Sequence, residues 1–341
     1  MLLREQVPLA PYTTFGIGGV ARYFVEATDE AMALEAVRYA RENHLPLFVL
    51  GGGSNVLVSD EGFPGVVLHI AIMGVEQDGN HFRVAAGENW DGFVALAIER
   101  GYGGVECLAG IPGTVGGTPV QNVGAYGQEV STTITTVRIL DRNHLTFGEL
   151  PAATCGFSYR RSIFNSTHRD RFIVTRVVYR LRPKAFPVIS YPDLKRYFGD
   201  RQDTPTLAEA AAAVREIRHQ KGMLLVEGDP DCRSAGSFFK NPVVAQAQYD
   251  AIVARASAAI PCYPGPRGLV KIPAAALLEQ SGFQKGFTLE QAGLSCKHTL
   301  ALINRGGASA AEIGALRDLI VATVEKRFGV RLEPEPVWVG G

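Results

Sequence analysis

A glycine-rich loop is the first feature of the sequence that could do chemistry, because Gly51, Gly52, Gly53, Ser54 and Asn55 follow one another. Glycines let backbone N–H groups come close to a pyrophosphate. The Ser54 hydroxyl and the Asn55 amide add further hydrogen-bond donors. Taken alone, such a loop could equally well be a tight turn between two strands.

The flanking sequence narrows the kinds of nucleotide site that this loop could form. Residues 46–50 and 56–59 are short apolar runs that predict a strand on each side. A dinucleotide-binding G-x-G-x-x-G opens a helix, and a P-loop needs a Gly-Lys pair. This loop opens a strand and has no lysine, so neither motif fits. A strand–loop–strand phosphate site instead resembles flavoproteins of the vanillyl-alcohol-oxidase type.

A second tract, Gly110 to Gly127, is also rich in glycine and proline. A flexible loop would explain the glycines but not the apolar residues among them, such as Ile111, Val115 and Val120. A rigid wall of bare backbone against a planar ring accounts for both. The two tracts together predict a site for a flavin.

Composition excludes several other classes of protein. The formal net charge is zero, so no bulk field attracts nucleic acid or an anionic membrane. The five cysteines are widely spaced without a C-x-x-C pair, which argues against a zinc site or a disulfide framework and favours a reducing compartment. No H-E-x-x-H occurs, and no metal is expected. We expect a cytoplasmic protein with no signal peptide, no membrane span and no nucleic-acid partner.

The predicted elements that carry these tracts alternate between helices and short strands. Residues 29–43 and 90–100 have helical periodicity, and β-rich runs separated by glycine turns lie around and between the tracts. Thr206-x-x-Glu209 and Ser309-x-x-Glu312 are capping-box signatures that open two further helices. The pattern predicts an α+β fold.

Five motifs in one order resemble the UDP-N-acetylenolpyruvoylglucosamine reductase family. The similarity extends from Tyr12 to Glu335, nearly the whole chain. The motifs are the loop 51–55, the tract 110–127, Tyr159-Arg-Arg-Ser-Ile-Phe164, Gly236-Ser-Phe-Phe-Lys-Asn-Pro242 and Leu332-Glu-Pro-Glu335.

The resemblance implies a two-subdomain FAD-binding domain of the vanillyl-alcohol-oxidase/PCMH type, followed by a C-terminal α+β substrate-binding domain. We expect the first subdomain at residues 1–66, with a C-terminal strand near 329–341 returning to it. The second subdomain is expected at 67–220 and the substrate domain at 221–328. FAD is expected to be non-covalent, with NADPH as hydride donor, a UDP-sugar as substrate and a monomeric protein.

The resemblance also implies a reaction and its catalytic residues. In the family, NADPH gives a hydride to the flavin, and the enolpyruvyl ether of UDP-N-acetylglucosamine then takes it, forming UDP-N-acetylmuramate for peptidoglycan. Arg160 matches the family position that stabilises charge on the carboxylate, and a guanidinium fork suits that task. Ser237 matches the proton donor and Glu335 the catalytic glutamate. Glu333 lies two residues earlier, so strand periodicity cannot choose between the two glutamates.

Cofactor and substrate contacts follow by the same matching. Tyr191, Lys221 and Asn241 match the family's contacts with the diphosphate of the substrate. The segment 222–234 is longer than the family pattern, so the spacing between Lys221 and Ser237 differs from the spacing in the family. The residues that match FAD contacts lie in both tracts and on one helix: Gly51, Gly52, Gly53, Ser54, Asn55, Ile111, Pro112, Gly113, Thr114, Gly116, Gly117, Gln121, Asn122, Gly124, Ala125, Tyr126 and Arg218.

Two alternatives stay open from the sequence. An oxidase of the same fold, acting on alcohols or hydroxy acids, often carries FAD tethered to a histidine near the first loop. His44 is the nearby histidine, and it precedes the loop at a predicted helix end. A non-catalytic flavin or nucleotide-sugar binding module would keep the glycine tracts, but it would not need Arg160, Ser237 and Glu335 together.

Overall fold

The computed structural model describes residues 1–340, which form two compact units. Unit 1 comprises Met1–Val7, Ala21–Gly53 and Phe63–Gln220. Unit 2 comprises Pro8–Val20, Ser54–Gly62 and the chain from Lys221 onward. The chain therefore passes from one unit to the other inside the first glycine-rich loop, between Gly53 and Ser54. The three-part division drawn from the sequence stays a prediction.

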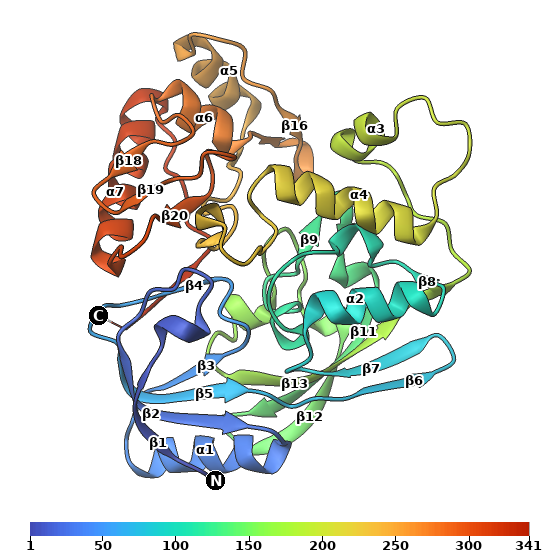
Figure 1. Ribbon diagram of the computed structural model, residues 1–341, viewed down its shortest axis with the longest axis vertical. Coiled ribbons are helices and arrows are strands. Elements are labelled where there is room, and N and C mark those ends of the chain that lie inside the picture. Colours follow the sequence, from blue (N-terminus) through green and yellow to red (C-terminus); the bar gives the residue numbers. More distant parts are fainter. Residues whose placement is uncertain (341) are drawn as a thin grey trace. The chain divides into compact units, whose positions relative to one another are not determined.

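The first sheet of unit 1 carries the strand that leads into this loop. Its order is β1-β2-β5-β3, and β5 pairs in parallel with both β2 and β3. Helix α1 (Glu30–Glu42) lies along this sheet (Figure 1) and buries an alanine-rich face. Asp29 caps α1 by accepting the N–H of Met32, an interaction of about 1 kcal/mol. The strands are β1 (Arg4–Pro8), β2 (Val20–Ala27), β3 (Leu47–Leu50) and β5 (Phe63–Ile70).

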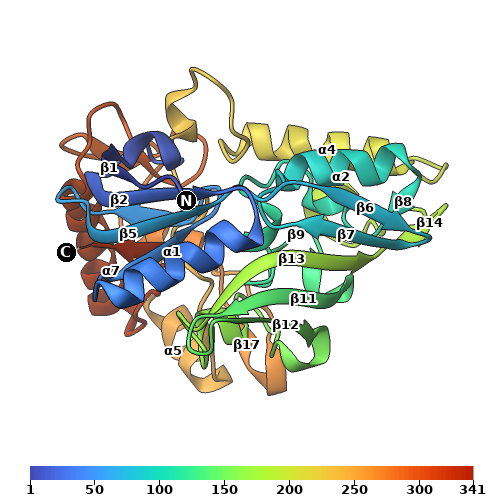
Figure 2. The ribbon, with the colours of Figure 1, turned by 90° about the horizontal axis from the view of Figure 1, so that it is seen from below.

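The second sheet of unit 1 is antiparallel, with the order β12-β11-β13-β7-β6 (Figure 2). One continuous apolar core runs through both sheets and the helices around them. The strands are β6 (Val75–Asp78), β7 (His81–Ala85), β11 (Ile134–Asp141), β12 (Thr146–Pro151) and β13 (Phe172–Arg180). Two short pairs complete the unit: β8 (Tyr102–Gly103) with β14 (Arg182–Pro183), and β9 (Gly124–Ala125) with β10 (Gln128–Glu129).

Helices α2 (Trp90–Glu99) and α4 (Leu207–Gln220) lie side by side in unit 1 (Figures 1 and 2). The capping box predicted for α4 is present, because Thr206 and Glu209 exchange hydrogen bonds. The short helix α3 (Pro192–Phe198) precedes α4 and begins directly after Tyr191.

In the part of unit 2 that the structure describes, small sheets and three α-helices surround a separate apolar core. Strand β4 (Val56–Val58), which follows the first glycine-rich loop, pairs in parallel with the C-terminal strand β21 (Val337–Val339). The other sheets have the orders β15-β17-β16 and β18-β19-β20. Their strands are β15 (Val243–Val244), β16 (Tyr263–Pro264), β17 (Val270–Lys271), β18 (Thr288–Leu289), β19 (Ala292–Leu294) and β20 (Leu302–Asn304), and the helices are α5 (Gln246–Arg255), α6 (Ala274–Gln280) and α7 (Ala310–Phe328).

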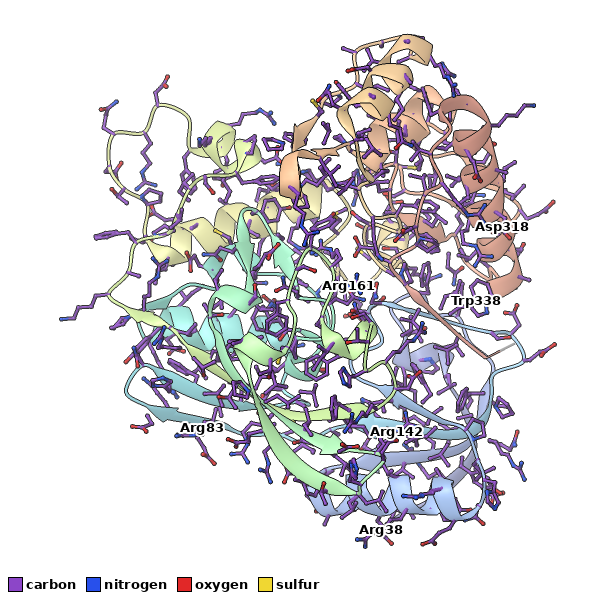
Figure 3. All side chains as sticks on the ribbon, turned by 180° about the vertical axis from the view of Figure 1, so that it is seen from behind. Arg38, Arg83, Arg142, Arg161, Asp318 and Trp338 are labelled. Atoms are coloured by element: carbon purple, nitrogen blue, oxygen red, sulfur yellow. The ribbon has the colours of Figure 1, made fainter. Side chains whose placement is uncertain are left out.

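Helix α7 anchors the C-terminal strand. The predicted capping box of Ser309 and Glu312 opens this helix. The ring of Trp338 (Figure 3) packs on α7, where a Cβ added to Gly314 would lie 2.9 Å from it. The Arg317 guanidinium lies 4.9 Å from the centre of the same ring. Within residues 1–340, every helix is too short or too polar to span a lipid bilayer.

Candidate active site

The two glycine-rich tracts meet in unit 1. A Cβ added to Gly52 would lie 2.6 Å from the Cα of Gly113, and one added to Gly51 would lie 2.9 Å from Oγ1 of Thr114. Any side chain at Gly52 would therefore collide with backbone. Glycine is needed here because two bare backbones come into contact. This contact brings together predicted FAD-binding residues that are about sixty positions apart in the sequence.

The second tract is held by hydrogen bonds along its backbone. Trp90 N–H donates to the Gly113 carbonyl at 3.1 Å, and Val115 N–H donates to the Glu88 carbonyl at 2.9 Å. Gly116 N–H donates to Ala86 at 2.9 Å. These backbone hydrogen bonds tie residues 113–116 to residues 86–90, as a wall of backbone requires, and its contact with a planar ring stays a prediction. Gly117 faces open space, since a Cβ there would meet nothing within 4 Å.

Three predicted site residues that are not glycine have left-handed backbone. The φ angles are 45° at Asn122, 48° at Tyr126 and 55° at Arg160. Such conformations cost free energy for residues with a Cβ, and they persist only where the surroundings fix them. Asn122 is fully buried, and its amide donates to Glu129 and to the Ser158 carbonyl at 2.9 and 3.1 Å.

Arg160 is half-buried and directed to the second tract. Its Nη1 donates to the Gly124 carbonyl at 2.9 Å. The amide of Asn165 donates to the Arg160 carbonyl at 3.1 Å, which helps to fix the strained backbone. The neighbouring Arg161 is exposed (Figure 3). Of the two adjacent arginines, Arg160 is therefore the one that is bonded to the second tract.

Two residues that support this motif were missed in the sequence. Ser162 is fully buried, and its hydroxyl donates to the Val120 carbonyl at 2.6 Å, joining the motif 159–164 to the second tract. Asn165 accepts the N–H of Ser162 at 2.9 Å. The spacing Ser-x-x-Asn is a capping pattern and could have indicated this short helical turn.

Tyr126, Arg218 and Tyr191 form a second group in unit 1. Burial raises the pKa of Tyr126 to about 12, so this phenol stays protonated near neutral pH. Arg218 is 8 % exposed, hydrogen-bonds Tyr126, and donates from Nε to the Gly110 carbonyl at 3.0 Å. The Tyr191 ring meets Tyr126 edge-on at 5.4 Å between centroids and is 40 % exposed.

In unit 2, the run around Ser237 lies antiparallel to the segment that carries Glu335. Glu335 N–H donates to the Phe238 carbonyl at 2.8 Å, and Lys240 N–H donates to the Glu333 carbonyl at 2.9 Å. The Asn55 amide donates to the Glu335 carbonyl at 3.1 Å, so a predicted FAD residue is bonded to a predicted catalytic one. Ser237 and Glu335 are both half-buried.

The structure distinguishes the two glutamates that periodicity could not. Glu333 is exposed, and its carboxylate accepts from Lys240 Nζ at 3.2 Å. Glu335 is half-buried and precedes β21. The Lys240 ammonium, whose direction could not be read from the sequence, is therefore turned toward Glu333.

The remaining predicted substrate residues of unit 2 lie at the ends of helices. Asn241 accepts the N–H of Ala274 at the start of α6, at 2.9 Å. Lys221 directly follows α4 in the sequence. Burial, and then the positive charges of Lys221 and Lys285, lower the pKa of His298 to about 4.

The longer segment 222–234 is ordered within unit 2. Asp231 is buried and accepts the N–H of Cys296 at 3.2 Å, while Asp229 forms an ion pair with Lys297. The Cys232 thiol donates to the Leu224 carbonyl at 2.8 Å. The extra residues thus form a folded turn with its own contacts.

Comparison with known proteins first defines the class of protein. A profile described as an FAD binding domain matches residues 21–144, and one described as the C-terminal domain of UDP-N-acetylenolpyruvoylglucosamine reductase matches residues 229–339. The fold and the touching glycine tracts are therefore those of a flavoprotein with an α+β, vanillyl-alcohol-oxidase-type FAD-binding domain, as predicted.

Relatives along the whole chain define the family. The chain is 46 % identical to UDP-N-acetylenolpyruvoylglucosamine reductase of Thermobifida fusca, over 98 % of each chain. It is 45 % identical to that of Streptomyces avermitilis, over 98 % of this chain and 94 % of the relative. The crystal structure of UDP-N-acetylenolpyruvylglucosamine reductase from Thermus caldophilus superposes with a TM-score of 0.70 at 25 % identity, covering 99 % and 100 % of the two chains. This chain belongs to the UDP-N-acetylenolpyruvoylglucosamine reductase family, and the predicted resemblance is confirmed.

Proposed function

We propose that this chain uses NADPH and non-covalent FAD to reduce the enolpyruvyl ether of UDP-N-acetylglucosamine to UDP-N-acetylmuramate. The observation that carries the proposal is the 46 % identity along 98 % of both chains to a reductase of that name. The oxidase alternative gains no comparable support.

The residues present suit FAD. Two glycine tracts touch through bare backbone at Gly52 and Gly113, and a Cβ added to Gly117 would meet nothing within 4 Å. The residues proposed to hold the cofactor are those of the two tracts together with Arg218. Bound FAD supplies hydride-transfer chemistry that side chains lack. NADPH is the reductant.

Arg160 is proposed to stabilise negative charge on the substrate carboxylate. Its Nη1 donates to the Gly124 carbonyl, which holds the guanidinium at the second tract, and a planar guanidinium fork suits a carboxylate. A cation fixed before the reaction loses little free energy on reorganising as charge develops. The left-handed backbone of Arg160, held by Asn165, supports a positioned rather than a mobile side chain.

Ser237 is proposed to donate the proton to the α carbon. A serine hydroxyl is a weak acid, so a neighbouring group must assist it. The charge of Lys240 is directed to Glu333, so we do not assign this task to Lys240. Glu335 is proposed as the catalytic glutamate near the developing charge, and its backbone N–H donates to the carbonyl of Phe238, the residue that follows Ser237.

Tyr191, Lys221 and Asn241 are proposed to hold the diphosphate. Tyr191 is 40 % exposed at the start of α3, where a ring can close over a ligand. The Asn241 side-chain oxygen is engaged by Ala274, which leaves its amide N–H groups as donors. Lys221 supplies positive charge.

The product is a peptidoglycan precursor, and we propose that the chain acts in the cytoplasm as a monomer, contributing to cell-wall biogenesis, cell shape and cell division. The free state of all five cysteines supports a reducing compartment. Cell fractionation and light scattering of the purified protein test these two points. Recovery with the membrane pellet, or a dimeric mass, would contradict them.

Three measurements test the reaction. The purified protein should be yellow, and acid precipitation should release FAD into the supernatant; flavin retained in the pellet favours a tethered oxidase. NADPH should be consumed steadily only when the enolpyruvyl sugar is added, which a mere binding module could not do. If both reactants use one flavin face, double-reciprocal plots should be parallel; intersecting lines would contradict a shared position.

A further inference from the structure

We propose that Asp91 is a positioning residue for FAD binding, which fixes the first peptide of the tract 110–127 and joins Arg215 of α4 to it. The proposal rests on the FAD-dependent function proposed above. Asp91 is outside every motif used to recognise the family.

Asp91 lies in the first turn of α2 and makes three charge-assisted contacts. Its Oδ1 accepts the N–H of Gly110 at 2.6 Å and Nη2 of Arg215 at 2.7 Å. Its Oδ2 accepts Nη1 of Arg215, also at 2.7 Å. The Asp91 and Arg215 side chains are 25 % and 37 % exposed. A bidentate ion pair whose carboxylate also accepts a backbone N–H has a more fixed geometry than an ordinary surface ion pair.

Both backbone polar groups of Gly110 are hydrogen-bonded to side chains. Asp91 holds its N–H, and Arg218 donates to its carbonyl at 3.0 Å. The φ of Gly110 is 72°, a conformation that favours glycine and that a free loop would readily leave. The two side chains together therefore set the direction in which the tract starts.

The charges of this group are coupled. Arg215 and Arg218 are three positions apart on α4 and so face the same side. Burial lowers the pKa of the Arg218 guanidinium, whereas Tyr126 and Asp91 raise it. Since Arg218 also hydrogen-bonds Tyr126, a line of contacts leads from Asp91 to two residues proposed to bind FAD.

The tract has a second, independent set of supports. The backbone bonds of residues 86–90 to residues 113–116 do not involve the Asp91 carboxylate. Loss of this carboxylate should therefore leave unit 1 folded and loosen only the first turn of the tract. A purely structural ion pair would do the reverse, lowering stability without changing cofactor affinity.

The test compares FAD affinity with the stability of the apoprotein. FAD is titrated into apoprotein and its fluorescence quenching gives Kd, while the melting temperature of each apoprotein is measured separately. Asp91→Ala should raise Kd by about 10- to 100-fold, the range for losing a hydrogen bond to a charged group. Asp91→Asn should lie between parent and Asp91→Ala, because the amide oxygen can still accept from Gly110.

Asp203→Ala is the matched control, since it removes a carboxylate that makes two bonds to Arg201 at the surface of unit 1. It should leave Kd for FAD unchanged. If Asp91→Ala melts lower but binds FAD like the parent, Asp91 is only structural and the proposal is overturned. If Asp91→Ala does not fold, Asp91→Asn decides, and a parental Kd for that variant also overturns it. A parent protein that fails to bind FAD would instead contradict the proposed function.

Discussion

Replacing Gly52 by alanine tests the contact between the two glycine tracts. Gly52 is exposed in the structure, and judged by exposure alone a single added methyl group at this position would be harmless. In the structure that methyl would lie 2.6 Å from Gly113 Cα, 2.9 Å from its carbonyl carbon and 3.1 Å from the backbone nitrogen of Thr114. All three neighbours are backbone atoms, which cannot move aside as a flexible side chain can.

The size of the effect follows from this overlap. Ordinary contact begins near 3.4 Å, so the tracts must separate by about 0.8 Å (3.4 less 2.6). Forced overpacking of this kind costs about 1–3 kcal/mol. If this free energy distorts the residues proposed to hold FAD, Kd for FAD rises about 5- to 150-fold. If it instead destabilises the folded state, the melting temperature of unit 1 falls by about 2–4 °C for each kcal/mol.

The assay is FAD titration of the apoprotein together with thermal unfolding. Gly92→Ala serves as control, because Gly92 lies in α2 and its added Cβ would meet only Asn89 at ordinary distances of 3.6 and 3.8 Å. That variant should bind FAD normally and melt slightly higher, since alanine favours helix by up to about 1 kcal/mol. If Gly52→Ala matched the parent in both affinity and melting temperature, the contact between the tracts would be refuted.

Three further substitutions separate the proposed roles. Ser237→Ala should leave NADPH-driven bleaching of the flavin nearly intact and slow reoxidation by the enolpyruvyl sugar by about 10²- to 10⁴-fold; equal slowing of both phases, in rapid-mixing spectra, would make Ser237 a structural residue. Tyr191→Phe should mainly raise KM for the sugar while bleaching by NADPH stays normal, and an unchanged KM would return Tyr191 to a packing role. The pKa of His298 falls from 6.5 to about 4, so below about pH 6.5 the unfolded chain binds a proton that the folded one does not. The melting temperature should therefore fall as the pH drops through this window, and it should fall less for His298→Gln than for the parent protein. If both proteins lost the same number of degrees between about pH 7 and pH 5, this assignment to His298 would be contradicted.

Features that depend on residues close together in the sequence, such as helix caps and glycine-rich loops, could be predicted from the sequence. Ser309 and Glu312 form the capping box that their spacing predicts, and α7 follows. The glycine composition of residues 51–55 and 110–127 predicted bare backbone, and both tracts supply it at their contact.

What the sequence could not provide are the contacts between distant residues. The meeting of Gly52 with Gly113 depends on how β3 and α2 are placed within unit 1. Periodicity treated Glu333 and Glu335 alike, whereas the structure separates them by their burial and by the ion pair of Lys240 with Glu333. Left-handed backbone at Arg160 has no composition signal, since the residue type itself disfavours it.

Asp91 illustrates the same limit. Its position in the first turn of α2 is readable as a favourable charge at a helix start. Its contacts with Gly110 and with Arg215 span nineteen and 124 positions in the chain, so they become visible only in the folded structure.

A single-turnover experiment tests the central claim most directly. The purified holoenzyme is bleached with a stoichiometric amount of NADPH without oxygen, and then mixed either with the enolpyruvyl ether of UDP-N-acetylglucosamine or with UDP-N-acetylglucosamine itself. The visible flavin absorbance should return only with the enolpyruvyl sugar, and the product should be heavier than that sugar by two hydrogen atoms. A flavin that stays bleached with the enolpyruvyl sugar, or that recovers equally with both sugars, would contradict the proposed reductase activity.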